Sequence, residues 1–200
     1  MMHTRSDRCA LCYARRAVLG TVLGVALAPA LFRLTCAEDA AEKAEPARLP
    51  PQLGDRFVFL TGPNKDQIVK LNALAVGGPQ VQVFPVGADG MIRNETPLNL
   101  VILARFDPAE LNEETRARAA EGVVAYSAVC THQACPVNMW SKARDAVVCS
   151  CHGSVYDLRN GAAVLDGPAP RPLPSLGLKV VDGEVMVAAG FSSRVGGTQK

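Results

Sequence analysis

Short apolar stretches alternate with turn-forming residues along most of this chain, from about Asp55 to Phe191. The stretches are rich in Val, Leu, Ile and Phe, and Gly, Pro or Asn lies between them, a pattern typical of β-strands and their connections. Near the end, Asp182-Gly183 favours the positive φ angles of a tight hairpin. The pattern predicts strands at Arg56–Leu60, Val81–Val86, Leu98–Phe106, Val123–Val129, Ala146–Cys149, Leu178–Val181 and Glu184–Ala188.

One segment, from Pro108 to about Glu121, favours a helix. Asp107 is a good N-cap residue, and Pro108 suits the first helical position because its missing N–H is not needed there. No internal repeat is apparent. We therefore expect a mainly β domain with one inserted helix.

The N-terminal region has a different character. Arg15-Arg16 precedes a run of sixteen apolar residues, 17–32, a pattern that resembles a twin-arginine export signal. The run is just below the roughly 17 to 25 residues that span a bilayer and just above the about 7 to 15 of a signal-peptide core. The length is therefore compatible both with a cleaved signal and with a retained N-terminal apolar helix.

Residues on either side of the run bear on this choice. Arg16 and Arg33 lie at its two ends, where long basic side chains reach the membrane interfaces. Small residues at 28–30 and 35–37 offer cleavage sites. We favour the retained anchor.

The remaining boundaries follow composition. Residues 38–54 are rich in Ala, Glu and Pro and are typical of a linker. The segment after Phe191 looks disordered. The expected organisation is a signal or anchor at 1–37, a linker at 38–54, one domain at 55–191 and a tail at 192–200.

Charge and histidine content limit the chemistry. The formal net charge is +2 and gives no reason to expect nucleic-acid binding. The chain has three histidines, and the one outside the motifs described next is His3. No Ser-His-Asp set or Gly-rich phosphate loop can be drawn.

Two short motifs hold the candidate ligands, Cys130-Thr131-His132-Gln133-Ala134-Cys135 and Cys149-Ser150-Cys151-His152-Gly153-Ser154. Thiolates and imidazoles bind iron or zinc. The spacings are C-x-H and C-x-x-H, with sixteen residues between His132 and Cys149. Zinc knuckles and covalent haem favour C-x-x-C and C-x-x-C-H. An iron-sulfur centre is the preferred interpretation, with zinc as the alternative.

The paired motifs resemble the Rieske [2Fe-2S] family over roughly residues 123–190. The resemblance implies an antiparallel β-sandwich with the cluster loops at one tip, and one [2Fe-2S] cluster per chain. Cys130 and Cys149 are expected on one iron and His132 and His152 on the other. Two neutral imidazoles in place of thiolates raise the reduction potential.

The other two motif cysteines, Cys135 and Cys151, match the pair that forms a disulfide between the cluster loops in high-potential members. Ala134 stands where the family usually has glycine. We expect a slightly different backbone path there, because glycine adopts conformations that alanine does not.

Further residues are expected to tune the cluster. Ser154 and Tyr156 match hydroxyls that donate to a bridging sulfide and to a ligand cysteine in high-potential relatives. The alternative is an ordinary turn serine and core tyrosine. Gly167-Pro168-Ala169-Pro170 resembles the proline loop that covers the cluster in the cytochrome bc family.

Cys9, Cys12 and Cys36 remain without an assigned role. The first two have C-x-x-C spacing, but no second ligand pair lies near them in sequence. Idle thiols are the preferred interpretation.

The histidine count separates the function classes. An oxygenase of this family needs a second iron held by two histidines and a carboxylate, and His3, the one histidine outside the motifs, cannot supply two. The bc-type resemblance implies an electron-transfer subunit that passes electrons from quinol to a c-type cytochrome, with cytochrome b and c partners. The alternative is the small subunit of a periplasmic molybdenum enzyme such as arsenite oxidase.

In the first case His132 and His152 would carry proton-coupled electron transfer. Electron uptake adds negative charge beside the imidazoles and so favours proton uptake at an exposed ring nitrogen. The expected location is the periplasmic face of a bacterial inner membrane after twin-arginine export, or the periplasm itself if the leader is cleaved. A soluble Rieske ferredoxin is disfavoured, because the expected disulfide needs an oxidising compartment.

Overall fold

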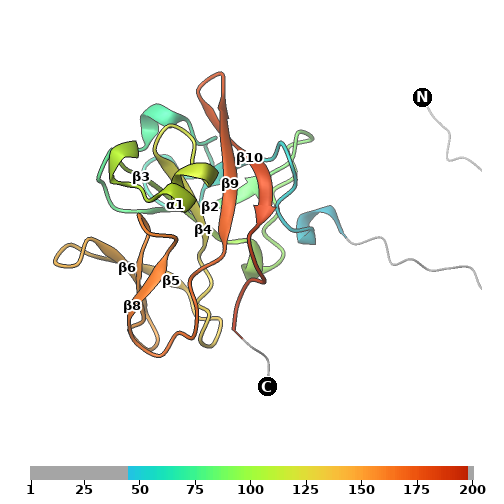
Figure 1. Cartoon of the computed structure of the whole chain (residues 1–200). Helices are drawn as coiled ribbons and strands as arrows, with labels where there is room; N and C mark the ends of the chain where they lie inside the picture. The colour runs from blue at the N-terminus through green and yellow to red at the C-terminus, as the bar shows by residue number, and fades with distance from the viewer. Residues whose placement is uncertain (1–44, 198–200) are drawn as a thin grey trace, which may run out of the picture. The chain divides into compact units, whose positions relative to one another are not determined.

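The computed structural model describes residues 45–197, which form ten strands, one α-helix and four 3-10 helices (Figure 1). The strands are β1 (Arg56–Phe59), β2 (Val81–Val86), β3 (Val101–Arg105), β4 (Val123–Ser127), β5 (Val137–Ser141), β6 (Ala146–Cys149), β7 (Val155–Asp157), β8 (Ala163–Asp166), β9 (Ser175–Val181) and β10 (Glu184–Phe191). The helices are η1 (Pro46–Arg48), η2 (Leu71–Ala73), η3 (Pro97–Asn99), η4 (Pro108–Glu110) and α1 (Glu113–Arg118).

Six strands close into an antiparallel barrel in the order β1-β10-β9-β4-β3-β2. The β9–β10 hairpin turns at Asp182 and Gly183, whose φ angles are 52° and 74°, as a type I′ turn requires. The mainly β, antiparallel fold that the resemblance implies is confirmed, and within it the main sheet closes into a barrel. Closure leaves this sheet without a free edge.

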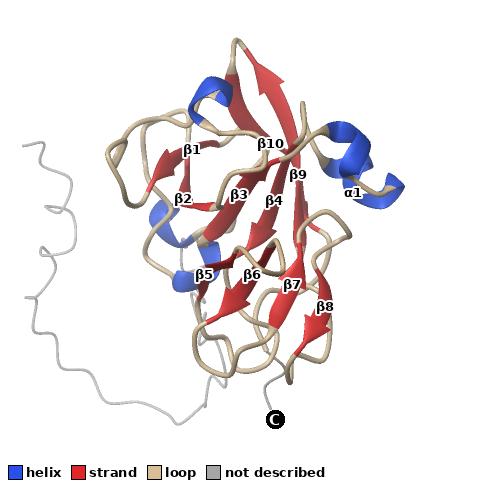
Figure 2. Ribbon diagram, turned by 90° about the vertical axis from the view of Figure 1, so that its left-hand side faces the viewer, coloured by secondary structure: helices blue, strands red, loops and turns tan. Residues whose placement is uncertain are grey.

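A second sheet has the order β5-β6-β7-β8 and is inserted between β4 and β9 in the sequence. Figure 2 shows it at the end of the molecule away from the β9–β10 hairpin. Strands β5, β7 and β8 are absent from the sequence prediction. β5 and β8 are largely exposed or half-buried and lack a strong apolar pattern, and β7 has only three residues.

Strands β3 and β4 form a wall shared by two hydrophobic cores. Leu103 and its register partner Ala125 belong to the core inside the barrel. Ile102 and its partner Tyr126 belong to the core under the second sheet. Both faces of the shared wall are therefore buried, which explains why these strands are almost continuously apolar.

The helical segment is shorter than expected. Asp107 caps η4, with its side chain accepting from the Ala109 N–H at 2.9 Å. Leu111 then adopts an extended conformation, with ψ of 135°, and is buried. Asn112 caps α1 by accepting from the Thr115 N–H at 2.8 Å. Burial of the leucine side chain divides the predicted helix in two.

Residues before β1 are bonded to the barrel, although the sequence pattern assigns them to the linker. The Asn99 side chain donates to the Leu49 carbonyl at 2.7 Å. The Arg93 guanidinium donates to the Pro46 carbonyl at 2.8 Å and to both carboxylate oxygens of buried Asp55. A buried arginine paired in this bidentate way fixes the entry of the chain into the domain.

Several sequence predictions concern residues outside the described part. These are the export signal with Arg15-Arg16, the apolar run 17–32, and Cys9, Cys12 and Cys36. Between residues 45 and 197, no helix is both long and apolar enough to cross a membrane.

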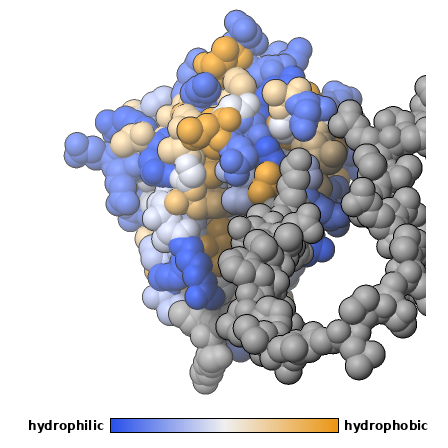
Figure 3. Space-filling model, turned by 90° about the vertical axis from the view of Figure 1, so that its right-hand side faces the viewer, coloured by the Kyte–Doolittle hydropathy of each residue, from blue (hydrophilic) through white to orange (hydrophobic). Residues whose placement is uncertain are grey.

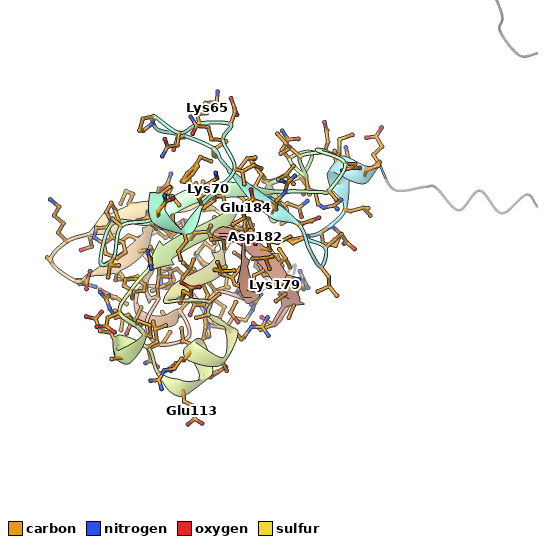
Figure 4. The ribbon with its side chains drawn as sticks, turned by 90° about the horizontal axis from the view of Figure 1, so that it is seen from above. Lys65, Lys70, Glu113, Lys179, Asp182 and Glu184 are labelled. Atoms are coloured by element: carbon orange, nitrogen blue, oxygen red, sulfur yellow. A yellow bond between two sulfur atoms is a disulfide. The ribbon has the colours of Figure 1, made fainter. Side chains whose placement is uncertain are left out.

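The end of the barrel at the β9–β10 hairpin is charged. In the view onto this end, Lys70, Lys179, Asp182 and Glu184 lie near the middle, and Lys65 lies at the edge (Figure 4). Figure 3 shows that the right-hand face of Figure 1 mixes hydrophobic patches with hydrophilic side chains. The second sheet lies at the other end (Figure 2), and the cysteine and histidine motifs lie in the loops that follow β4 and β6.

Candidate metal centre

Three loops meet beyond the second sheet. The first loop (residues 128–136) joins β4 to β5, the second loop (150–154) joins β6 to β7, and the proline loop (167–174) joins β8 to β9. A disulfide between Cys135 and Cys151 links the first two, with Cα atoms 6.2 Å apart. The cross-link between the cluster loops is therefore present, as the resemblance implies.

Hydrogen bonds tie the proline loop to the other two. The Thr131 hydroxyl donates to the Arg171 carbonyl at 2.6 Å, which joins the first loop to the proline loop. The Ala169 N–H donates to the Ser154 hydroxyl oxygen at 3.2 Å, which joins the second loop to it. Each loop is bonded to both of its neighbours.

Two free, buried thiols lie inside this arrangement, Cys130 and Cys149, each about 1% exposed. The backbone N–H of Cys130 donates to the Cys135 carbonyl at 2.8 Å, and that of Cys149 donates to the Ser154 carbonyl at 2.9 Å. Burial raises the pKa of the Cys149 thiol. A thiolate at this position needs a nearby cation, such as iron, to offset the loss of hydration.

Not every sulfur here can bind a metal. The Sγ atoms of Cys135, Cys149 and Cys151 lie within 4.8 Å of one another. The first and last are bonded to each other, so Cys149 is the one member of this trio with a free thiol.

The two imidazoles are neighbours. The ring centroids of His132 and His152 lie 4.7 Å apart, with the rings at 82° to each other. His152 is exposed and His132 is half-buried. Nδ1 of His132 is buried and has no hydrogen-bond partner. A buried polar atom without a partner is costly, and a metal ion would satisfy its lone pair.

The donor set fits a [2Fe-2S] cluster. Two buried thiols and two adjacent imidazoles could supply the two sulfur and two nitrogen ligands that a Rieske centre requires. Cys130, Cys149, His132 and His152 would hold it, and the sequence prediction selects these same four residues.

Tyr156 contacts one of the expected ligands. Its hydroxyl lies 3.1 Å from Sγ of Cys130 and 3.5 Å from the hydroxyl of Thr131. Burial raises the pKa of Tyr156, so the phenol keeps its proton and can donate it to the sulfur. A donor at a ligand sulfur stabilises the reduced, more negative cluster.

Tyr156→Phe should therefore lower the reduction potential by about 40 mV without loss of the cluster, because a net hydrogen bond of about 1 kcal/mol corresponds to that shift for one electron. A redox titration followed by circular dichroism measures it. Tyr126→Phe is the matched control: this buried tyrosine donates to the Leu158 carbonyl at 3.0 Å and should leave the potential unchanged. If the unaltered protein and both variants have the same reduction potential, Tyr156 is an ordinary core residue that does not tune the cluster.

Ser154 is fully buried under the proline loop. Its oxygen accepts from Ala169, which leaves its own O–H able to donate to a cluster sulfide, as the resemblance implies. Gly167 has φ of +90°, and a Cβ at this position would lie 2.9 Å from the Ser154 nitrogen. The proline loop can approach the second loop this closely only with glycine there.

Ala134 lies in the first loop with φ of +57°. This is the left-handed region that glycine adopts freely and that costs other residues roughly 1 to 2 kcal/mol. The alanine thus keeps the conformation suited to glycine, under strain, where the sequence predicts a different path.

Ala134→Gly should raise the free energy of unfolding by about 0.5 to 1 kcal/mol, the relief of strain less the added flexibility of the unfolded chain. Ala163→Gly provides the control, because Ala163 lies in β8 and has no positive φ. That change should lower the stability by a similar amount. Urea unfolding measures both, and a destabilising Ala134→Gly would show that the methyl group contributes more than the strain costs.

Two residues near the site lie outside the sequence prediction. Thr131 joins the first loop to the proline loop, and Arg171 accepts its hydrogen bond. Thr131 lies between two expected ligands, Cys130 and His132, so its position in the motif could have indicated a role in shaping the first loop. Arg171 lies in the proline loop just after the Gly-Pro-Ala-Pro segment, and nothing in the sequence indicated its role.

Comparisons with known proteins agree with this geometry. Residues 100–177 match the family model described as Rieske [2Fe-2S] domain. A cytochrome bc1 complex Rieske iron-sulfur subunit of Streptomyces lividans is 34% identical over 154 residues, which cover 74% of this chain and 90% of that protein. The subunit of the same name from Streptomyces coelicolor is 30% identical, with 74% of this chain and 43% of the longer relative covered.

A third relative has a different context. A Haloferax mediterranei protein named as a Rieske subunit of a respiratory nitrate reductase is 32% identical over 120 residues, covering 60% of this chain and 52% of its own length. One assignment follows from the ligand motifs, from the three loops joined by the disulfide and hydrogen bonds, and from the extent of similarity to the Streptomyces lividans subunit. The chain belongs to the Rieske [2Fe-2S] protein family and is of the cytochrome bc1 type.

Proposed function

We propose that this protein takes an electron together with a proton from quinol and passes the electron to a c-type cytochrome, as the Rieske subunit of a quinol-oxidising complex with cytochrome b. The observation that carries the proposal is the pair of imidazoles at the tip. His152 is exposed and lies 4.7 Å from His132, centroid to centroid, while Cys130 and Cys149 are buried behind them.

Each group of residues has a distinct task. When bound, the cluster supplies a one-electron carrier. The buried thiols of Cys130 and Cys149 shield one side from water, and the exposed ring of His152 can meet a quinol hydroxyl and take up its proton. Tyr156 and Ser154 provide the hydroxyls that favour the reduced state.

The rim around the imidazoles suits docking. Pro136, Pro168 and Pro170 are exposed beside the ligand motifs. Proline has a fixed φ, so a proline-rich rim loses little conformational entropy when it binds a partner. Exposed Leu165, at the end of β8, adds apolar surface next to the proline loop.

We also propose that the domain works on the periplasmic face of an inner membrane. The Cys135–Cys151 disulfide is stable in an oxidising compartment. The twin-arginine pattern at Arg15-Arg16 fits export of a folded, cofactor-loaded protein. Lysine in place of both arginines should leave the protein in the cytoplasm, as fractionation would show.

A second candidate function is the small Rieske subunit of a periplasmic molybdenum oxidoreductase, of which arsenite oxidase is one example. The Haloferax mediterranei relative, named for a respiratory nitrate reductase, favours this class. In that setting the centre would relay electrons without taking a proton from quinol.

Purification of the native protein from membranes separates the two. A Rieske electron paramagnetic resonance signal that copurifies with cytochromes b and c, and that is reduced by quinol, supports the quinol complex. The same signal with a large molybdenum subunit supports the second candidate. A native preparation without any Rieske signal would overturn both.

A further inference from the structure

The segment that follows β10, residues 192–197, is ordered, although the sequence pattern favours disorder there. We call it the C-terminal strap. In Figure 1 it continues from β10 toward the end of the molecule that bears the three loops. At its start, the Ser192 N–H donates to the Ser175 carbonyl at 2.8 Å, and the Ser175 N–H donates to the Ser192 hydroxyl at 3.0 Å.

Arg171 fastens the strap to the proline loop. Its guanidinium donates to the carbonyls of Arg194 and Gly196, at 2.8 and 2.6 Å, and to the hydroxyl of Ser193 at 3.4 Å. Its own carbonyl accepts from Thr131 in the first loop. One residue therefore joins the strap, the proline loop and the first loop.

The end of the strap lies directly on the first loop. A Cβ on Gly197 would collide with the carbonyl oxygen of His132 and would lie 3.4 Å from Cα of Gln133. Gly196 is buried, has φ of +82°, and its Cβ position lies 3.8 Å from the Ala134 methyl. The strap thus lies against the backbone of His132 and Gln133 and against the methyl group of Ala134. At Gly197 only glycine permits so close an approach.

From these contacts we propose that the C-terminal strap holds the first loop in the position that His132 needs as a ligand, and that Arg171 is the positioning residue that fastens it. The proposal rests on the assignment of His132 to the cluster. The disulfide fixes the first loop at Cys135, and the strap fixes the three residues before it. Loss of the strap lets this half of the loop open locally and exposes the buried Nδ1 of His132 to water.

Two variants and two matched controls test the proposal in the full-length holoprotein. Arg171→Ala removes the fastening, and Gly197→Ala places a methyl group against the His132 carbonyl. Arg144→Ala removes an arginine from an exposed ion pair with Asp166, and Gly190→Ala adds a methyl group where nothing lies within 4 Å.

Two measurements are made on all four proteins. The first is amide hydrogen exchange at residues 132–134, and the second is the rate of cluster loss to a chelator, followed by visible circular dichroism. We expect both variants to speed exchange at 132–134 roughly tenfold. Arg171→Ala removes the side-chain hydrogen bonds that fasten the strap, and Gly197→Ala forces the strap away from the His132 carbonyl, so in each case less opposes local opening of the loop. Cluster loss should accelerate several-fold, and both controls should match the unaltered protein.

Arg171→Lys adds a graded test. Lysine keeps the charge but lacks the planar fork that reaches several acceptors at once, so it should restore only part of the protection. Exchange that rises equally in the barrel strands would indicate general destabilisation and overturn the positioning role. Unchanged exchange at 132–134 in both Arg171→Ala and Gly197→Ala would also overturn it.

The outcome is separable from that of the proposed function. Hydrogen exchange reports on the polypeptide whether or not quinol is the donor. If quinol proves not to be the donor but exchange is altered in the variants, the proposed role of the strap still holds. If quinol oxidation is normal but exchange is unchanged, only the proposed role of the strap is overturned.

Discussion

His132→Ala should abolish the Rieske electron paramagnetic resonance signal of the native protein. The change removes one of the two expected nitrogen ligands, and no other histidine except His152 lies in the described residues to replace it. We expect complete loss of the signal and of the bound iron, measured by spectroscopy and iron analysis of the purified protein.

The neighbouring residue supplies the control. Gln133 is exposed, and Gln133→Ala should retain both signal and iron. An unchanged spectrum in His132→Ala would contradict the ligand assignment. Loss of the signal in both variants would mean that the first loop, and not one ligand, had been disrupted.

Removal of the disulfide should have the second largest effect. In the Cys135→Ser, Cys151→Ser double variant, the unfolded chain regains the entropy of a loop with a sequence separation of 16 residues. Loop-closure entropy of this size corresponds to about 3 kcal/mol of stability. Urea unfolding should show a loss of this order, and the cluster should be released faster because the two loops can separate.

A control variant isolates the cross-link. Ser150→Ala, next to Cys151, removes a hydroxyl that donates to the Pro136 carbonyl at 3.3 Å and should change the stability by much less. If the double variant is as stable as the unaltered protein, the hydrogen bonds among the loops and the strap are enough to hold the loops together without the disulfide.

The expected ligands are predictable from sequence because a Rieske centre imposes a fixed spacing on a few chemically distinct residues. The bounds of β2 and β6 match the predicted ranges Val81–Val86 and Ala146–Cys149, since short apolar runs there end at turn residues. Barrel closure was not predictable. It depends on the pairing of β1 with β10, two strands far apart in the sequence, and no local pattern reports on such pairing.

The C-terminal strap illustrates the same limit. Ser192, Ser193, Gly196 and Gly197 have the composition of a flexible tail, and nothing in their local sequence favours order. Their position is set by contacts with Arg171 and with the first loop, which only the folded chain brings together.

The wall formed by β3 and β4 has a consequence for how the protein melts. Because Ile102 and Tyr126 belong to one core and Leu103 and Ala125 to the other, neither core has a complete boundary without these two strands. Excision of the second sheet would expose the apolar outer face of the barrel to water. The barrel and the cluster-bearing sheet should therefore denature in a single cooperative transition, and a fragment that lacks either part should not fold.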